Sequence, residues 1–397
     1  MKLAVVIPAL NEEKSIEGII NRCLNAIPNI IKATSVNSVE ITVVSDGSTD
    51  NTVSLASKYT DKIKLIIFEI NRGYGAAIKE GWENSDADLL GFLDADGTCE
   101  PNFFADLCNM LIDENADIAL GSRLNPNSQM PLIRKIGNKF YSTILSMVSF
   151  QKIKDTASGM RVVKRSSLHR IMPLPDGLHF TPAMSARAIL SQDLKIVEKD
   201  MTYHEREGES KLKVFRDGIR FLGIILKNII LYQPYKILTF FAVLGLLFCL
   251  AIMFYPITFY VKNNIVEEWM IYRFILSEVV GTVSMLLLSA ANLSKKILSI
   301  TLSKNTSIKD FSLLNLFKPV PSIIIIIISL VAGTALIYDS FVQRLTTNVT
   351  YEHWSRFVVM SFCYSTSFIF ITNLILDHIL NLINERLVYL KSKNIFL

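Results

Sequence analysis

Two carboxylates stand one residue apart at the end of an apolar run. Residues 89–93 (LLGFL) have the length and composition of a buried strand, and Asp94 and Asp96 follow directly. Carboxylate oxygens are hard ligands that suit Mg²⁺ or Mn²⁺. Such a cation can hold a diphosphate and stabilise the charge on it as it leaves. The Asp-x-Asp pattern is weak alone, because solvated loop acids are common, so the neighbouring loops decide its meaning.

Three other loops carry polar or glycine residues directly after short apolar runs. They are residues 8–12, 46–48 and 71–75. The Asp46 carboxylate could accept hydrogen bonds from a nucleobase, or it could be a turn residue beside Gly47. Gly73 and Gly75 permit close approach of the backbone, but Ile78 stands where a dinucleotide-binding loop has its third glycine. NAD binding is therefore disfavoured, and the sequence has no GxxxxGK[ST] phosphate loop.

Basic residues form a third candidate group. Arg123 follows another short apolar run, and further basic residues come at intervals after it: Arg134, Arg161, Arg206 and Lys211. A site that brings two anionic groups together needs cations, and the arginine fork matches phosphate oxygens better than lysine does. Each arginine taken singly could equally be a surface charge.

The elements that must position these residues follow from the alternation of apolar and amphipathic runs through residues 1–120. The expected strands are residues 3–7, 41–45, 63–68, 89–93 and 118–120. The expected helices are residues 12–26, 51–59, 75–84 and 102–115. This alternation predicts an α/β domain with a mostly parallel sheet covered on both faces. Ligands bind beyond the carboxyl ends of such strands, which is where the four loops converge.

Four stretches after residue 230 are long and apolar enough to cross a bilayer as helices. They cover about 237–260, 274–293, 321–338 and 357–380. A hydrocarbon core of about 30 Å needs roughly 20 such residues. Glu278 is the one charge inside the first three stretches and up to residue 376 of the fourth. Buried helices of a soluble protein are the alternative, and four in succession argue against it.

Charge patterning predicts the orientation of these spans. Residues 294–320 carry five lysines and one aspartate, whereas the connections 261–273 and 339–356 are mixed in sign. The positive-inside rule then places the N-terminal domain, this connection and the C-terminus in the cytoplasm. A glycosylation sequon, Asn348-Val349-Thr350, falls in a connection expected outside.

Composition excludes two other classes of protein. The net charge of +5 is modest, and no basic face with interleaved aromatic residues precedes residue 210, so nucleic acid is not an expected partner. The five cysteines form no CxxC pair, which argues against a zinc framework.

Two segments mix basic and large apolar residues at helical spacing. They are residues 132–150 and 210–235, and the second runs straight into the first span. Such helices can lie in the headgroup layer of a membrane, although ordinary packing helices have similar patterns. The expected organisation is therefore an α/β domain over 1–209, an interfacial segment over 210–235 and a four-helix transmembrane domain over 236–397.

Seven stretches in the first 215 residues together resemble family 2 glycosyltransferases of the GT-A fold. Within that family they are most similar to the polyprenyl-phosphate glycosyltransferases typified by dolichyl-phosphate mannose synthase. In the family's order they are 6–12 (VIPALNE), 45–50 (SDGSTD), 72–77 (RGYGAA), 94–96 (DAD), 121–123 (GSR), 155–161 (DTASGMR) and 208–212 (GESKL).

The resemblance implies a membrane enzyme that moves a hexose from a GDP- or UDP-hexose to a dolichyl or undecaprenyl phosphate with inversion, aided by Mg²⁺ or Mn²⁺. It also implies roles for residues on the donor side: Pro8, Leu10, Glu12, Asp46 and Gly75 at the nucleotide-sugar, Asp94 and Asp96 at the metal, and Arg206 and Lys211 at the diphosphate. Arg123, Arg134 and Asn138 would hold the lipid phosphate.

Three positions depart from the pattern of the mannose synthases. Thr98 stands where they usually have a metal-ligating glutamine, and Arg206 is one residue closer to the GESKL stretch than usual. The family's Phe-x-x-Glu reads Phe180-Thr181-Pro182-Ala183 here. A UDP-hexose donor is therefore as consistent with the sequence as GDP-mannose. A phosphate monoester is already anionic at neutral pH and needs no general base, which fits the missing acid.

Two other functions remain as alternatives. A processive polysaccharide synthase would carry a QxxRW motif, and none of the three tryptophans, Trp82, Trp269 and Trp354, completes one. A transporter or channel with a nucleotide-sensing domain would need several polar residues across its spans, and Glu278 is the one clear charge there. The sequence leaves the oligomeric state open, a homo-oligomer included.

Overall fold

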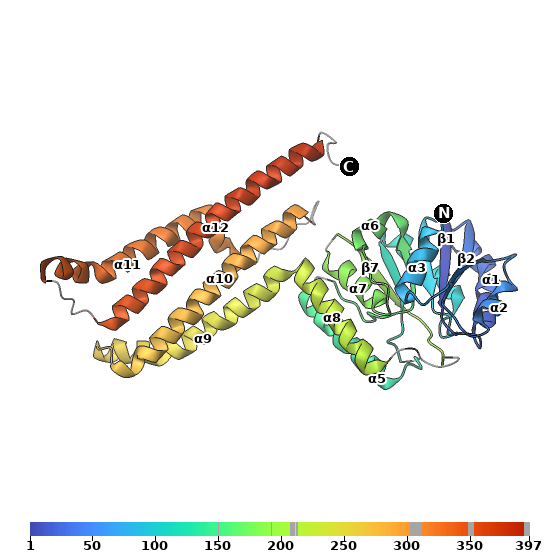
Figure 1. Ribbon diagram of the computed structural model, residues 1–397, viewed down its shortest axis with the longest axis horizontal. Coiled ribbons are helices and arrows are strands. Elements are labelled where there is room, and N and C mark those ends of the chain that lie inside the picture. Colours follow the sequence, from blue (N-terminus) through green and yellow to red (C-terminus); the bar gives the residue numbers. More distant parts are fainter. Residues whose placement is uncertain are drawn as a thin grey trace. The chain divides into compact units, whose positions relative to one another are not determined.

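The computed structural model describes residues 1–126, 128–149, 151–191, 193–206, 211, 213–301, 312–347 and 353–392. The chain divides into two compact units, Met1–Tyr232 and Gln233–Leu397 (Figure 1). The predicted sequon and most of the GESKL stretch lie outside the described residues, whereas Lys211 lies inside them.

The first unit is built on a seven-stranded sheet. Its strands are β1 (Lys2–Ala9), β2 (Ser38–Asp46), β3 (Lys64–Phe68), β4 (Leu89–Leu93), β5 (Ile118–Ser122), β6 (Met160–Lys164) and β7 (Ile196–Asp200). Their order across the sheet is β3-β2-β1-β4-β6-β5-β7. Only β6 runs antiparallel to its neighbours β4 and β5. The other six strands therefore end at one edge of the sheet, and β6 begins there.

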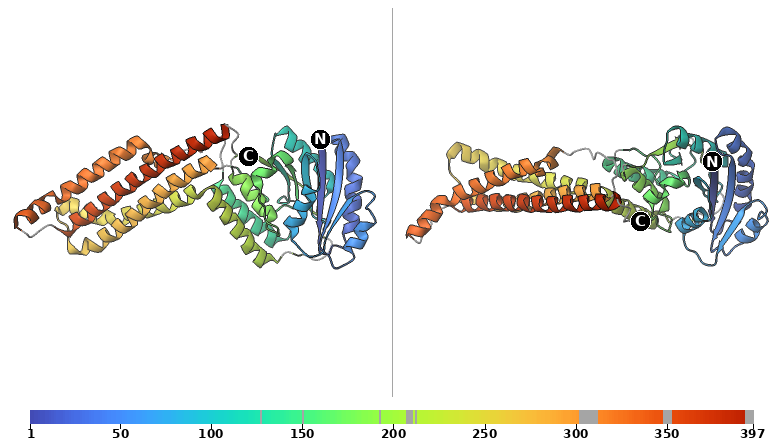
Figure 2. Two further views of the ribbon diagram at one scale, coloured as in Figure 1. Left: turned by 45° about the horizontal axis from the view of Figure 1, so that its top comes forward. Right: turned by 90° about the horizontal axis from the view of Figure 1, so that it is seen from above.

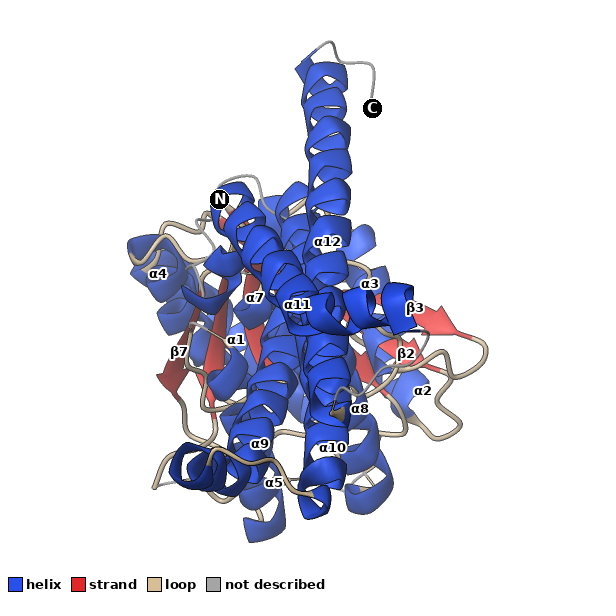
Figure 3. Ribbon diagram, turned by 90° about the vertical axis from the view of Figure 1, so that its left-hand side faces the viewer, coloured by secondary structure: helices blue, strands red, loops and turns tan. Residues whose placement is uncertain are grey.

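Helices cover both faces of this sheet (Figures 2 and 3). One layer contains α1 (Ile16–Ala33), α2 (Thr52–Ser57) and, after the 3₁₀ turn η1 (Pro101–Phe103), α4 (Phe104–Asp113). The other layer contains α3 (Tyr74–Glu83) and α7 (Phe180–Leu190). Alternate residues of β1 serve the two layers: Leu3, Val5 and Ile7 pack in the first, and Ala4 and Val6 in the second. The predicted α/β fold class is confirmed.

Two further helices of the first unit lie side by side. They are α5 (Leu132–Val148) and α8 (Val214–Tyr232), and the Tyr141 hydroxyl of α5 donates to the Gly218 carbonyl of α8 over 2.9 Å (Figure 1). Both carry large exposed apolar side chains, among them Ile136 on α5 and Phe215 and Ile219 on α8. Both helices pack against each other and against α7, and these exposed apolar side chains lie outside those contacts.

The second unit is helical in its described residues (Figure 3). It consists of α9 (Pro234–Asn263), η3 (Glu268–Met270), α10 (Ile271–Thr301), η4 (Ser312–Phe317), α11 (Pro319–Thr347) and α12 (Trp354–Ser392). Four of these helices are long and apolar enough to cross a membrane, and most of their apolar surface faces outward. Gly245 and Gly281 let the helices approach closely, since a Cβ there would meet Ser284 and Phe362 within 3 Å.

Several element boundaries differ from those expected. The helix expected from residue 12 begins at Ile16, because the Glu12 carbonyl first accepts hydrogen bonds from the N–H groups of Ser15 and Ile16 in a turn. Strands β6 and β7 and helix α7 were not among the elements expected. The segment expected at the membrane interface, 210–235, contributes its helix α8 to the first compact unit.

Candidate active site at the carboxyl edge of the sheet

The two acids after β4 have different surroundings. Asp94 accepts a hydrogen bond on Oδ1 from the Tyr74 hydroxyl at 2.6 Å. Asp96 is buried, and its Oδ1 accepts bonds from the Thr98 backbone N–H at 3.2 Å and the Thr98 hydroxyl at 2.7 Å. Thr98, which replaces the glutamine of the mannose synthases, thus holds Asp96 in position.

Electrostatics at this pair favour a cation. Burial raises the pKa of Asp94 well above its usual value, and the nearby Asp96 charge raises it further, while the Tyr74 hydrogen bond opposes both. Burial and the Asp94 charge also raise the pKa of Tyr74, so its hydroxyl keeps its proton. A positive charge between Asp94 and Asp96 would relieve their repulsion.

Arg206 approaches the acids from the segment that follows β7. Its Nη1 lies 3.1 Å from Oδ2 of Asp96, and its Nη2 donates to Glu12, which follows β1. The Nε of Arg206 is buried and has no hydrogen-bond partner among the described residues. Lys211 reaches the same edge, with Nζ 3.1 Å from the Asn11 carbonyl oxygen. The structure therefore brings together the acidic and basic groups predicted for the donor side.

Other predicted donor residues make contacts within the protein. The buried Asp46 carboxylate accepts hydrogen bonds from the backbone N–H groups of Arg72 and Gly73, the shortest at 2.6 Å. Gly75 donates its N–H to the Asp176 carbonyl, and a Cβ at Gly75 would lie 2.2 Å from the Pro175 carbonyl oxygen. Asp46 therefore holds the loop before α3, and Gly75 packs in the first turn of that helix. Pro8 is buried at the end of β1, and Leu10 is half-buried beyond it.

Two of the three residues predicted for a lipid phosphate, Arg123 and Asn138, bind a carboxylate that the sequence analysis did not assign. Asp155 is fully buried and pairs with both Nε and Nη2 of Arg123, at 2.8 and 2.9 Å. Asn138 donates to the same carboxylate and accepts bonds from the N–H and hydroxyl of Thr156. Arg134 is half-buried in the first turn of α5, on the same helix as Asn138.

Arg161 is fully buried inside β6. Its guanidinium donates to the carbonyl oxygens of Ser158 and Thr156 and to the Ser185 hydroxyl, each at about 3 Å. Burial lowers its pKa to about 10. This arginine therefore braces the loop that enters β6 from the site edge.

The loop that enters β6 also packs closely against Asp94. A Cβ at Gly159 would lie 1.8 Å from Oδ2 of Asp94, and the Gly159 carbonyl accepts the Asp94 N–H. Tyr74, Asp155 and Gly159 are thus site residues that the sequence analysis did not single out. The stretches RGYGAA and DTASGMR contained them, but only the three-dimensional contacts reveal their partners.

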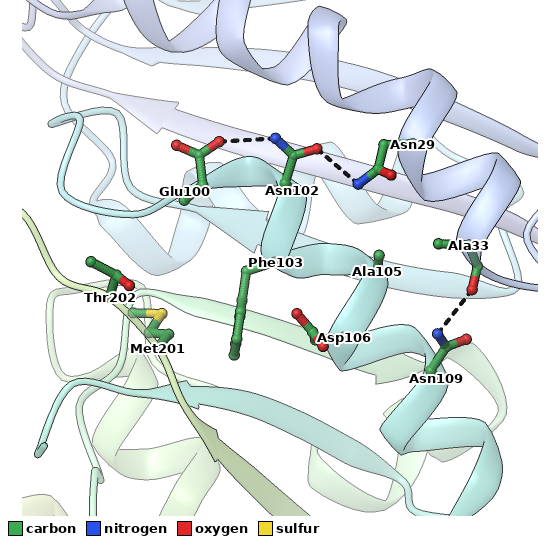
Figure 4. A pocket seen from close by; sticks show the side chains of 10 residues that line it. All are labelled: Asn29, Ala33, Glu100, Asn102, Phe103, Ala105, Asp106, Asn109, Met201 and Thr202. Carbon is green, nitrogen blue, oxygen red and sulfur yellow. Dashed lines mark hydrogen bonds between the residues drawn. The ribbon is translucent and has the colours of Figure 1, made fainter.

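A cavity of about 420 Å³ lies elsewhere on the first unit, between α1, α4 and the segment after β7 (Figure 4). Asn102 bridges two of its lining residues, donating to Glu100 and accepting from Asn29. None of the predicted site residues is among the described residues that line it. We therefore assign the chemistry to the sheet edge.

The acids at the edge fit a divalent cation in part. Their oxygens are of the type that Mg²⁺ and Mn²⁺ prefer, and their mutual repulsion is what a cation relieves. No group of three or more His, Cys, Asp or Glu side chains among the described residues could hold a metal alone. Remaining ligands would have to come from a bound diphosphate and water, which is typical of Mg²⁺ sites.

Known proteins match the part of the chain that carries most of these residues. A family model described as Glycosyl transferase family 2 matches residues 4–172. The low-salt glycan biosynthesis hexosyltransferase Agl6 of Haloferax volcanii is 34% identical over 57% of this chain and 53% of its own length, so the match spans about half of that relative.

Two further relatives align over more of their length. The UDP-N-acetylglucosamine–dolichyl-phosphate N-acetylglucosaminyltransferase of Methanococcus voltae is 30% identical over 41% of this chain and 70% of its own length. The dodecaprenyl-phosphate galacturonate synthase of Rhizobium johnstonii is 26% identical over 76% of this chain and 85% of its own length. With its GT-A sheet and the edge site described above, this chain belongs to glycosyl transferase family 2.

Proposed function

We propose that the chain transfers a hexose from a nucleotide-sugar to a polyprenyl phosphate, with inversion at the anomeric carbon. The observation that carries this proposal is the meeting of Asp94, Asp96 and Arg206 at the sheet edge, in a chain whose later helices are apolar enough to cross a bilayer. Relatives named for dodecaprenyl-phosphate and dolichyl-phosphate support a lipid phosphate as acceptor.

On the donor side, Asp94 and Asp96 would hold Mg²⁺ or Mn²⁺, which when bound offsets charge on the departing diphosphate. Arg206 pairs with both Asp96 and Glu12, and its Nε, which has no hydrogen-bond partner among the described residues, would donate to a phosphate oxygen. Lys211 adds a second positive charge at the same edge. The nucleoside of a GDP- or UDP-hexose would lie near Pro8, Leu10, Glu12, Asp46 and Gly75.

On the acceptor side, we assign direct contact with the lipid phosphate to Arg134. Arg123 and Asn138 both bind Asp155, so they fix the shape of the acceptor site through that carboxylate. The attacking phosphate oxygen is already anionic at neutral pH, so no side chain has to remove a proton from it. Catalysis then depends on positioning and on neutralisation of charge.

The apolar faces of α5 and α8 would rest in the headgroup layer and admit the polyprenyl chain from the bilayer. Only Gln233 separates α8 from α9, the first of the four long apolar helices. With four crossings, both chain ends lie on one side of the membrane. We place that side, and the catalytic domain with it, in the cytoplasm because lysines are concentrated in the 294–320 connection.

The test uses the full chain in detergent with undecaprenyl phosphate and a panel of radiolabelled GDP- and UDP-hexoses. Label should enter an organic-extractable phosphodiester with one donor and not with the others. Asp94→Asn and Asp96→Asn should each remove most transfer while leaving the protein folded, and EDTA should do the same. Label found only in a long water-soluble polymer would overturn the proposal in favour of a processive synthase.

A further inference from the structure

The two carboxylate oxygens of Asp96 are engaged by different partners. Oδ1 accepts hydrogen bonds from the backbone N–H and the hydroxyl of Thr98, at 3.2 and 2.7 Å. Oδ2 lies 3.1 Å from Nη1 of Arg206. Thr98 is fully buried on the same loop as Asp96, so its bonds fix the orientation of the carboxylate. Oδ2 is therefore the oxygen that Asp96 can offer to a cation, and the Arg206 guanidinium lies against it.

Arg206 is also held by a second acid. Its Nη2 donates to Glu12, and both Glu12 and Asp96 are buried, whereas the Arg206 side chain is 21% exposed. Two buried carboxylates need a positive partner, and the guanidinium serves both. Among the described residues Glu12 forms no three-acid metal group with Asp94 and Asp96, so its contact serves Arg206. Arg206 thus supplies the positive charge that a divalent cation would bring to this edge.

The segment that carries Arg206 is anchored by its backbone up to His204. Tyr203 forms a β-bridge with Cys99, and the His204 N–H donates to the Thr98 carbonyl at 2.9 Å. Arg206 comes two residues after the last of these bonds, and its long side chain reaches back to the acids. Rotation about its side-chain bonds can therefore move the guanidinium while the anchor stays in place.

The Arg206 guanidinium also has the capacity to bind an anion. Its Nε is buried and has no hydrogen-bond partner among the described residues, a costly situation that a ligand oxygen would relieve. Lys211 brings a second positive charge to this edge, with Nζ 3.1 Å from the Asn11 carbonyl oxygen. Because a guanidinium can bind two phosphate oxygens at once, a diphosphate can replace the acids as its partner.

We propose that Arg206 competes with the divalent cation for Oδ2 of Asp96 and leaves this carboxylate when the cation binds, so that its guanidinium becomes available to the donor diphosphate. Arg206 then alternates between two sets of anionic oxygens, those of the acids and those of the phosphates. The inference rests on the proposed function, since it needs a metal at Asp96 and a diphosphate donor. It makes the binding of the cation and of the diphosphate interdependent.

The first test measures Mn²⁺ binding to the purified full chain in detergent, without nucleotide, from the loss of the electron paramagnetic resonance signal of the free ion. Arg206→Ala removes the competing positive charge. It should bind Mn²⁺ roughly 10- to 150-fold more tightly, because no charge-assisted contact has to be broken first. Arg206→Lys keeps the charge and should stay near the native affinity.

Two control variants make the comparison specific. Arg170 also pairs with a carboxylate, that of Asp117, but Asp117 lies directly before β5 and so at the opposite edge of the sheet. Arg170→Ala removes the same charge as Arg206→Ala and should bind Mn²⁺ as the native chain does. Asp96→Asn should lose the binding. Thermal unfolding of each variant shows whether it is folded.

The second test needs no substitution. Phenylglyoxal modifies accessible guanidinium groups, and mass spectrometry gives the rate of modification at each arginine of the native chain. Mn²⁺ alone should raise the rate at Arg206 and leave the rate at Arg170 unchanged. Addition of UDP or GDP to the Mn²⁺-bound chain should lower the rate at Arg206 again, because phosphate oxygens then hold the guanidinium.

A Mn²⁺ affinity of Arg206→Ala that is no higher than the native affinity, or a modification rate at Arg206 that Mn²⁺ leaves unchanged, would overturn the inference. The proposed function would stand in that case if Asp96→Asn still loses the metal. A rate that stays high with both UDP and GDP would overturn the transfer of the guanidinium to the diphosphate. Equal Mn²⁺ affinities of Asp96→Asn and the native chain would instead refute the metal at this edge, and with it the donor side of the proposed function.

Discussion

The Tyr74 hydroxyl holds the side chain of Asp94 in place by donating a hydrogen bond of 2.6 Å to it. The raised pKa of Tyr74 keeps this hydroxyl protonated. Tyr74→Phe removes this bond but keeps the ring that packs edge-on against Phe92 and Phe180. A hydrogen bond to a charged group contributes about 1.5–3 kcal/mol, so we expect transfer to fall at least about 10-fold with little change in stability. Turnover rate and thermal unfolding of the purified variant check this, and native-like turnover would show that Asp94 needs no such support.

Substitutions of Arg206 and Arg134 should affect the KM values of the two substrates differently. Arg206 touches the acids of the donor side, so Arg206→Ala should raise the KM for the nucleotide-sugar by roughly 10- to 150-fold and leave that for polyprenyl phosphate nearly unchanged. Arg134→Ala should have the reverse effect. The measurement titrates each substrate with the other saturating, alongside direct nucleotide binding. Loss of nucleotide binding in Arg134→Ala but not in Arg206→Ala would mean that the two anion sites are exchanged.

Arg123 and Asp155 form a buried pair whose loss should be felt as stability. Burial alone would raise the pKa of Asp155, but the Arg123 guanidinium and the hydrogen bonds from Arg123 and Asn138 hold it below its usual value. A carboxylate with a lowered pKa in the folded state stabilises the fold above its unfolded pKa of about 3.9, and this contribution disappears as the pH falls through the folded value.

Asp155→Asn should therefore lower the free energy of unfolding by about 3–5 kcal/mol at neutral pH, because it leaves Arg123 buried without its charge partner. The difference from the native chain should stay constant from neutral pH down to about pH 4 and shrink below that. Thermal unfolding of both proteins across this range checks the prediction. A difference that grows with acid would assign the stabilising charge to another group.

At the level of elements, the sequence predicts segments of uniform composition more accurately than segments of mixed composition. The run 89–93 is apolar throughout and ends at Asp94, and β4 has those bounds. Strands β6 (MRVVK) and β7 (IVEKD) mix charges with apolar residues, so their pattern resembles a surface segment. The burial of Arg161 within β6 could not be foreseen, because its acceptors come from a loop and a helix that only folding brings together.

The residues of the site also differ in how far the sequence predicts their positions. Glu12 and Asp94 follow parallel strands and Asp46 ends one, so the topology alone predicts that they meet at one edge. The roles of Tyr74 and Asp155 depend on partners that are 20 and 32 residues away along the chain. Spacing in sequence says nothing about contacts of this range unless the register of every intervening element is known.

The helices α5 and α8 lead to a prediction about the membrane surface. Ile219 is 58% exposed on α8, and in water such an apolar face would be costly, whereas the headgroup boundary accepts it. In vesicles that contain brominated lipid, a fluorophore attached at Ile219→Cys should be quenched, and the same fluorophore at the exposed Lys62→Cys should not. Equal fluorescence at both positions would show that this face of α8 meets another protein surface.

For the whole molecule, the decisive question is which way the spans run. The second unit contributes an even number of candidate spans, so Lys262 at the end of α9 and Asn315 in η4 fall on opposite sides of the membrane if each helix crosses once. The lysines of 294–320 favour the cytoplasm for Asn315, since translocating them is opposed. The same orientation keeps the edge site beside soluble nucleotide-sugars, which cannot cross a bilayer unaided.

Single cysteines test this orientation in intact cells with a membrane-impermeant maleimide. Lys262→Cys should be labelled from outside, and Asn315→Cys only after permeabilisation. The native background is low, because Cys23, Cys99 and Cys108 are buried in the first unit and the other two cysteines lie within apolar helices. The reverse pattern would place the catalytic edge outside the cell, where no nucleotide-sugar pool supplies it, and would contradict both the topology and the proposed donor.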